Sequence, residues 1–250
     1  MPRTASPIAI LSALPQEQEG LVHSMTGLQI VTRAGRAFSV GQLDGQPVVL
    51  ALSRIGKVAA AATTATLLEH FGARAVVFTG VAGGVGPGVA VGDVVVASGF
   101  VQHDMDASPL FPRYEIPLTG QSVWAADPAW TQALALALAA QHVLRGADYS
   151  GHTVQVHQGL IATGDRFVCA AQEAQQLVQN LAQAGHAALA VEMEGAAVAQ
   201  VCNDYGVPMA AVRTVSDRAD DTAHVDFPQF VDTVARVYAQ KIIRTLLQSL

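Results

Sequence analysis

The chain has 250 residues, of which 51% are hydrophobic and 14% charged, a balance that fills a large core and allows apolar surface to be buried in an oligomer. Asp and Glu outnumber Lys and Arg by 20 to 14 and the basic residues form no stripe, so we expect neither nucleic acid nor an anionic membrane as a partner. No Pro-, Gly- or Ser-rich linker divides the sequence, which predicts one domain over residues 1–250.

The N-terminal segments predict alternating strands and helices. The apolar run Ile8–Ala13 is expected to be a buried strand, and Pro15 stands where the first turn of a helix should begin. Glu17 therefore lies just beyond the carboxyl end of a strand, where ligands of α/β proteins bind. The segments Arg36–Leu43 and Pro47–Ser53 flank an Asp-Gly turn and predict a hairpin.

A glycine-rich segment follows the next predicted strand. An Ala- and Thr-rich helix after Ile55 ends near Phe71, and Ala75–Thr79 is an apolar strand expected at the centre of a sheet. The loop that follows, Gly80–Gly88, lacks the G-x-G-x-x-G spacing and leads into a strand instead of a helix. We therefore expect no dinucleotide cofactor, and expect the glycines to let the backbone approach a small ligand closely.

The middle of the chain offers a weak metal signal and an ambiguous aromatic residue. His103, Asp104 and Asp106 are neighbours on one strand end, which rarely suffices to hold an ion, so we expect no metal. After the predicted strand Thr153–Thr163, Phe167 either stacks on a planar ligand ring or folds back onto the core, and the local sequence leaves both open.

Several features indicate a cytoplasmic protein. Cys169 and Cys202 lack metal-type spacing and are typical of thiols in a reducing compartment. The apolar start, Ile8–Leu14, resembles an internal strand more than a signal peptide. The apolar run Leu134–Ala140, within a helix predicted from Asp127 through His142, is too short to cross a bilayer.

The most informative segment reads as strand, helix, strand. Ala188–Val191 and Met209–Val215 are the predicted strands, and Glu192, Glu194 and Asp217 interrupt their apolar ends. Any one of these acids alone is better explained structurally, as a carboxylate that complements a helix dipole for example. The three together favour a functional site at the carboxyl ends of the strands.

The whole pattern predicts an α/β fold with a central mixed twisted sheet and helices on both faces. On that scaffold Glu17, Glu194 and Asp217 would gather along one rim with aromatic and backbone surface. Because no Ser-His nucleophile, Walker loop or metal cluster accompanies them, they indicate cleavage of a glycosidic bond, in which one carboxyl protonates the leaving group and another activates water. An apolar pocket would raise the pKa of the acid toward neutrality.

Seven motifs follow one another in chain order: Ser12–Glu17, Ser53–Val58 (SRIGKV), Thr79–Gly84 (TGVAGG), Gly92-Asp93, Gly164–Val168 (GDRFV), Val191–Glu194 (VEME) and Arg213–Asp217 (RTVSD). Together they resemble the bacterial 5'-methylthioadenosine/S-adenosylhomocysteine nucleosidases of the purine nucleoside phosphorylase superfamily. The resemblance covers nearly the whole chain. It implies a three-layer αβα, nucleoside phosphorylase-like fold and hydrolysis of 5'-methylthioadenosine, S-adenosylhomocysteine and 5'-deoxyadenosine to adenine and the 5-substituted ribose.

The resemblance also implies roles for single residues. Glu17 would deprotonate the attacking water, Asp217 would protonate N7 of adenine, and Glu194 would hold the ribose hydroxyls. The other implied contacts are Phe167 stacked on adenine, the backbone of Val168 at the adenine edge, Met193 beneath the sugar, Glu192 and Arg213 in the polar shell, Ser216 orienting Asp217, and Leu14, Ile55, Ala107 and Phe227 around the 5' substituent. Leu110 and Pro117 match a loop that enters the neighbouring subunit of a homodimer.

Two departures from the family pattern concern the pocket. Val81 stands where some relatives carry a hydroxyl residue, so a hydrogen bond to the water or to Arg213 is lost, and we expect the Gly80 backbone or solvent to replace it. The loop Ala107–Ile116 also differs from many relatives, which leaves the preferred 5' group open.

Three alternative functions are weighed against hydrolysis of these nucleosides. A phosphorylase would need cationic donors for phosphate, for which only Arg54 and Arg213 lie nearby, and Glu17 would repel the dianion. A hydrolase of 6-amino-6-deoxyfutalosine, an adenine nucleoside of menaquinone synthesis, would use the same acids. A non-catalytic nucleoside-binding protein would not require both Glu17 and Asp217.

Overall fold

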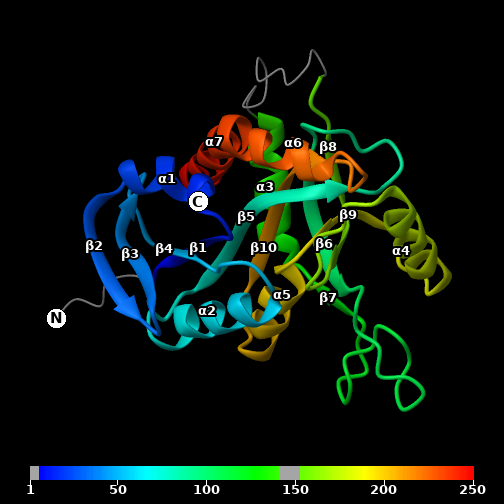
Figure 1. The fold of residues 1–250 in the computed structure, drawn as a ribbon. Coiled ribbons are helices and arrows are strands. Elements are labelled where there is room, and N and C mark those ends of the chain that lie inside the picture. Colours follow the sequence, from blue (N-terminus) through cyan, green and yellow to red (C-terminus); the bar gives the residue numbers. More distant parts are fainter. Residues whose placement is uncertain (1–5, 141–152) are drawn as a thin grey trace.

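The computed structural model describes residues 6–140 and 153–250 and contains a large mixed sheet with helices on both faces (Figure 1). The strands are β1 (Ile8–Ser12), β2 (Thr26–Arg33), β3 (Arg36–Leu43), β4 (Gln46–Leu52), β5 (Ala75–Gly84), β6 (Val94–Gln102), β7 (Val123–Ala125), β8 (Val156–Thr163), β9 (Ala188–Glu192) and β10 (Met209–Asp217). The helices are α1 (Pro15–His23), α2 (Lys57–Glu69), α3 (Pro128–Ala140), α4 (Ala171–Gln183), α5 (Gly195–Asp204), α6 (Ala223–Phe230) and α7 (Arg236–Gln248), with a π-helical turn η2 (Val231–Ala235).

Half of the sheet closes into a ring. Strand β5 pairs with β10, β10 with β6, β6 with β8, β8 with β9, and β9 returns to β5, while β1, β4, β3 and β2 extend from β5 as an open wing. Gly83 of β5 is the point of closure, because it pairs with Val191 of β9 and with Asp217 of β10. The register therefore brings the acid-bearing ends of β9 and β10 to the same place.

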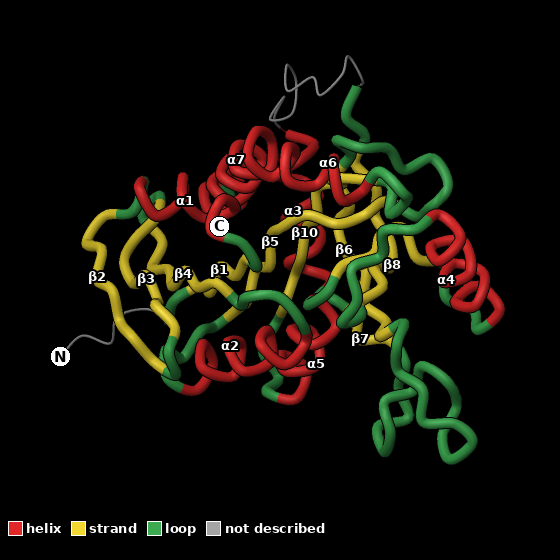
Figure 2. The backbone as a smooth tube through the Cα atoms, in the orientation of Figure 1, coloured by secondary structure: helices red, strands yellow, loops and turns green. Residues whose placement is uncertain are grey.

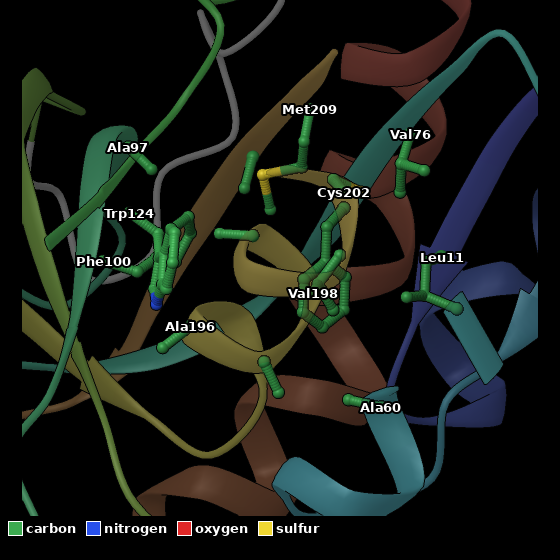
Figure 3. Close-up of a cluster of buried hydrophobic side chains, with 14 of the residues drawn as sticks. Leu11, Ala60, Val76, Ala97, Phe100, Trp124, Ala196, Val198, Cys202 and Met209 are labelled. Carbon is green, nitrogen blue, oxygen red and sulfur yellow. The ribbon is translucent and has the colours of Figure 1, made fainter. Parts of the chain in front are cut away.

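Alternating side chains of the sheet supply two cores, as expected for strands covered on both faces. Ala9 and Leu11 of β1 belong to the cluster packed against α2 and α5, part of which is drawn in Figure 3. Ile8 and Ile10 of the same strand point to the opposite cluster with residues of α1, α3 and α7. Figure 2 shows the sheet between these helices, which confirms the predicted three-layer α/β fold.

The structure corrects the boundary of the glycine-rich segment. Residues 80–84 belong to β5, because their small side chains allow pairing with β10 and β9 on both sides. Strands β2 and β7 and helix α4 had no counterpart among the elements predicted above. The predicted end of α3 at His142 lies outside the described residues. Across those residues, none of the helices combines the length and apolarity needed to cross a bilayer.

Candidate active site

A cavity of about 310 Å³ opens where the ends of β5, β9 and β10 meet the loops after β1, β4 and β8. Its walls are predominantly apolar, and most of the residues singled out in the sequence lie in them. The predicted residues that line it are Leu14, Glu17, Ile55, Val81, Phe167, Glu192, Met193, Glu194, Arg213, Ser216, Asp217 and Phe227. The structure thus brings together acids from both ends of the chain.

Glu17 is buried on one side of the cavity and held there by backbone groups. Its Oε2 accepts hydrogen bonds from the N–H groups of Ala13 (2.9 Å) and Leu14 (3.0 Å), and its Oε1 accepts one from Val81 (3.2 Å). Burial raises the pKa of the Glu17 carboxyl, against the lowering effect of these N–H groups and of the Arg213 charge. A fixed carboxyl with a raised pKa suits a general base.

Asp217 is buried at the end of β10, with its carboxyl oriented by its own segment. Its Oδ2 accepts a hydrogen bond from the Ser216 hydroxyl and its Oδ1 accepts one from the Ala219 N–H, both at 2.8 Å. Gly83 leaves room for this carboxyl, because a Cβ at that position would lie 2.9 Å from Asp217 Oδ1. Only a residue without a side chain tolerates so close an approach.

Glu192 and Arg213 form a buried ion pair in the wall of the cavity, with a distance of 2.9 Å between Arg213 Nη2 and Glu192 Oε2. Glu192 also accepts the N–H of Gly195 (2.8 Å), so it is the carboxylate that caps α5, a role considered above for Glu194. Arg213 Nη1 donates to the carbonyls of Phe78 and Val212. These two hydrogen bonds help to hold the guanidinium beside the cavity.

Glu194 belongs to the cavity and is anchored from another loop. Its Oε1 accepts a hydrogen bond of 2.7 Å from the Gly56 N–H, just before α2. Burial, followed by the charge of neighbouring Glu192, raises the pKa of Glu194 to about 8. A carboxyl buried beside another acid is costly to ionise, and its oxygens are able to accept hydrogen bonds from a ligand's hydroxyl groups.

Aromatic side chains face each other at the cavity. The rings of Phe167 and Phe227 meet edge to face with their centroids 5.7 Å apart, and Phe167 is 40% exposed. Phe167 therefore lines the cavity and does not fold back onto the core. Val168 is buried beside it and lines a small adjoining pocket together with Phe167, Met193 and Asp217.

Two predicted residues lie away from this cavity within one chain. Ala107 and Leu110 belong to the long excursion between β6 and β7, seen to extend away from the sheet in Figure 2, and neither lines the cavity. Two contributors were missed in the sequence. Thr163 donates its hydroxyl to Glu192, and Gly56 orients Glu194. The glycine at position 56, in the resemblance motif SRIGKV, was the available signal.

The cavity offers acids and little cationic charge. Among its described lining residues Arg213 is the single cation, and it is paired with Glu192. Arg54, the other candidate for phosphate binding, lies outside the lining and donates to the Gly35 carbonyl. Within residues 6–140 and 153–250, no group of His, Cys, Asp and Glu side chains gathers to hold a metal ion.

Known proteins resemble this chain over almost its full length. The sequence profile of the phosphorylase superfamily matches residues 7–248. A 5'-methylthioadenosine/S-adenosylhomocysteine nucleosidase from Shewanella halifaxensis is 35% identical, over 96% of this chain and 99% of the relative. The Neisseria meningitidis nucleosidase in complex with methylthio-immucillin-A is 34% identical with a TM-score of 0.86, covering 98% of this chain and 100% of that one. Futalosine hydrolase of Helicobacter pylori is 30% identical with a TM-score of 0.86, covering 98% of both chains.

Proposed function

This chain belongs to the phosphorylase superfamily and, within it, to the 5'-methylthioadenosine/S-adenosylhomocysteine nucleosidases, and from that premise we propose that it hydrolyses the N-glycosidic bond of 5'-substituted adenosines. The products are adenine and the free 5-substituted ribose, a reaction that serves methionine salvage and nucleoside catabolism. One observation carries the proposal: two buried carboxyls, of Glu17 and Asp217, line a single apolar cavity.

Glu17 is proposed to activate the nucleophile. The hydrogen bonds from three backbone N–H groups fix its carboxylate beside Gly80 and Val81. A water held against this carboxylate gives up its proton to Glu17 as its oxygen bonds to C1' of the ribose. The raised pKa of Glu17 strengthens it as a base at neutral pH.

Asp217 is proposed to protonate the departing purine. As the bond between C1' and N9 breaks, its electron pair enters the adenine ring, and a proton from Asp217 reaches N7 so that a neutral base leaves. The Ser216 hydroxyl and the Ala219 N–H hold the Asp217 carboxyl for this transfer. Phe167 stacks on the adenine with Val168 at its edge, Met193 lies under the sugar, and Glu194 accepts hydrogen bonds from the ribose hydroxyls.

The same geometry disfavours phosphate as the nucleophile. A phosphorylase must neutralise a dianion in its site, whereas the single cation among the described lining residues is committed to Glu192. Glu17 occupies the region where phosphate would bind and repels it. The acids also disfavour a non-catalytic nucleoside-binding protein, in which the desolvation cost of burying two carboxyls would have no catalytic role to offset it.

The test is product formation without phosphate. Purified protein in phosphate-free buffer receives 5'-methylthioadenosine, S-adenosylhomocysteine or 5'-deoxyadenosine, and adenine and reducing sugar are measured by chromatography. We expect both products in equal amounts, at a rate that added phosphate leaves unchanged. Strict dependence on phosphate with a sugar 1-phosphate product would assign the chain to the transferases, and tight binding without turnover would assign it to the receptors.

A second substrate is favoured by one structural comparison. The likeness to futalosine hydrolase of Helicobacter pylori is as close in TM-score as the likeness to the Neisseria nucleosidase. Hydrolysis of 6-amino-6-deoxyfutalosine would use the same two acids with a bulkier 5' group. Including this nucleoside in the assay and comparing kcat/KM values decides between the two specificities.

We further propose a cytoplasmic homodimer in which residues 1–250 work as one domain. The β6–β7 excursion supports the dimer, because it extends away from the sheet (Figure 2) and carries Leu110 and Leu118, which are 84% and 91% exposed. Leu110 would then complete the 5' pocket of the partner subunit. The free thiols of Cys169 and Cys202 are consistent with a reducing compartment. Light scattering on the purified protein measures the oligomeric state.

A further inference from the structure

Next to the cavity, a polar network ties together three segments that are distant in the sequence. The Lys57 ammonium at the start of α2 forms an ion pair with Asp104, which follows β6. The Asp104 carboxylate also accepts the backbone N–H of Asp165 (2.9 Å), which follows β8. Asp165 connects back to the start of α2, because its Oδ1 accepts a hydrogen bond of 2.7 Å from the backbone N–H of Lys57.

The network is built from charge-assisted bonds. Lys57 also donates to the Gln102 side chain, and Gln102 in turn bonds to Gln200 of α5. Burial alone would raise the pKa of Asp104, but the bonds from Lys57 and from the Asp165 N–H hold that pKa below its ordinary value. Asp104 is therefore a firm ionic anchor for both loops at neutral pH.

Two successive backbone N–H groups at the start of α2 are held by carboxylates from elsewhere. The Gly56 N–H donates to Glu194 at 2.7 Å, and the next one, of Lys57, donates to Asp165 at 2.7 Å. Gly56 has φ of 96°, a conformation that needs glycine. The N-cap residue of α2 is Gly56, which has no side chain to cap the helix. Asp165 supplies the capping carboxylate from another loop.

We propose that Asp165 is a positioning residue, which fixes Glu194 for the ribose hydroxyls by holding the peptide between Gly56 and Lys57. The inference rests on the proposed function, because it assumes that Glu194 binds the ribose. If the Lys57 N–H loses its acceptor, the first turn of α2 loses its cap, and the adjoining Gly56 N–H is held less firmly toward Glu194 Oε1. Asp165 itself is outside the residues that line the cavity and acts on the ligand only through Gly56.

Asp165→Ala separates this role from that of the neighbouring loop. The substitution removes the acceptor of the Lys57 N–H and a 3.9 Å ion pair between Asp165 Oδ2 and Lys57 Nζ, which Asp165→Asn also removes. It keeps the backbone N–H at position 165, which still donates to Asp104. The loop that carries Phe167 therefore stays anchored, and purine stacking should persist. Asp165→Asn keeps an acceptor oxygen at the same place and serves as the conservative variant. Asp127→Ala is the matched control, because Asp127 accepts the Trp130 N–H at the start of α3, away from the cavity.

The experiment measures binding, so that it stands apart from turnover. Calorimetry gives Kd for adenine and for a C-nucleoside analogue of 5'-methylthioadenosine, whose carbon–carbon bond to the ribose resists hydrolysis. We expect Asp165→Ala to weaken the nucleoside about tenfold and adenine less than twofold, whereas Asp165→Asn and Asp127→Ala bind both like the wild type. In a Glu194→Ala background, which lacks the side chain that Gly56 positions, adding Asp165→Ala should change nucleoside affinity less than twofold.

Other outcomes overturn the proposal. Equal losses for adenine and nucleoside would show that the substitution disturbs the purine loop, and an undiminished loss in the Glu194→Ala background would show a route that bypasses Glu194. Wild-type affinity in Asp165→Ala would remove the residue from the site altogether. Failure of phosphate-free hydrolysis by the wild type would instead refute the proposed function, and the nucleoside binding data would still decide the role of Asp165.

Discussion

Replacing Glu194 by Gln should stabilise the ligand-free protein while weakening nucleoside binding. Burial and the neighbouring Glu192 raise the pKa of Glu194 from an ordinary 4.5 to about 8. At neutral pH the folded protein therefore holds a proton that the unfolded chain releases. Glutamine has no proton to lose, and its side-chain oxygen is able to accept the Gly56 N–H as the carboxyl does.

The sign and size of the effect follow from the pKa shift. Because the folded pKa lies above the unfolded one, the stabilising contribution of the protonated carboxyl is fully present below pH 4.5 and is lost as pH rises through about 8. Each pKa unit corresponds to about 1.4 kcal/mol, so the loss at pH 7 is about 3 kcal/mol. Glu194→Gln should exceed the wild type in unfolding free energy by up to that amount at pH 7, and by little near pH 4.5.

Urea unfolding followed by circular dichroism at pH 5, 6, 7 and 8 measures the difference. We expect the advantage of Glu194→Gln to grow with pH, at close to 1.4 kcal/mol per unit near pH 6. Glu19→Gln is the control, because the Glu19 side chain is 53% exposed and its replacement should give a difference that is small at every pH. A Glu194→Gln variant that is less stable than the wild type, or equally so at all pH values, would refute the reasoning.

The remaining predictions concern catalysis and assembly. Asp217→Asn and Glu17→Gln should each lower kcat at least ~100-fold in the adenine-release assay with unchanged folding, the scale of losing a general acid or base; near-normal rates would remove the residue from its role. Gly83→Ala should lower kcat, since its Cβ would lie 2.9 Å from Asp217 Oδ1; an active variant would show that the acid has room to move. Leu110→Asp should yield a monomer of reduced activity by light scattering, whereas Leu136→Asp on α3 should not; a dimeric Leu110→Asp would exclude that loop from the interface.

Local patterns carried much of the fold prediction. The strand β1, the β3–β4 hairpin and the β9–α5–β10 unit have apolar runs, turn residues and helical periodicity that identify them within a few residues. Strand β2 was missed because its alternating apolar run is short: Leu28 and Ile30 alternate along it, and both are exposed like nearly all of the strand. The closed ring was not predictable, because it depends on the register between β5 and β9, which no local pattern encodes.

The candidate site, like the fold, was predictable from the sequence only in part. Acids at strand ends were recognisable because charged residues interrupt apolar runs, and the structure brings Glu17, Glu194 and Asp217 into one cavity. The groups that hydrogen-bond to these acids were not recognisable in the sequence. The partner of Glu194 is a backbone N–H of Gly56, and backbone donors leave no signature in side-chain chemistry. Ala107, which the resemblance places around the 5' substituent, lies outside the cavity that one chain forms by itself.

The glycines of β5 explain why the acids can be buried so close to the sheet. A Cβ at Gly80 would lie 3.1 Å from Glu17 Oε1, and one at Gly83 would lie 2.9 Å from Asp217 Oδ1. One strand therefore makes room for both carboxyls. A side chain at position 83 would require Asp217 to shift, and one at position 80 would crowd Glu17 by a few tenths of an ångström. The part of the cavity formed by β5 is thus constrained by the two carboxyls that it must accommodate. Differences in the accepted 5' group must then arise at its mouth, where Ile55 and Phe227 are partly exposed.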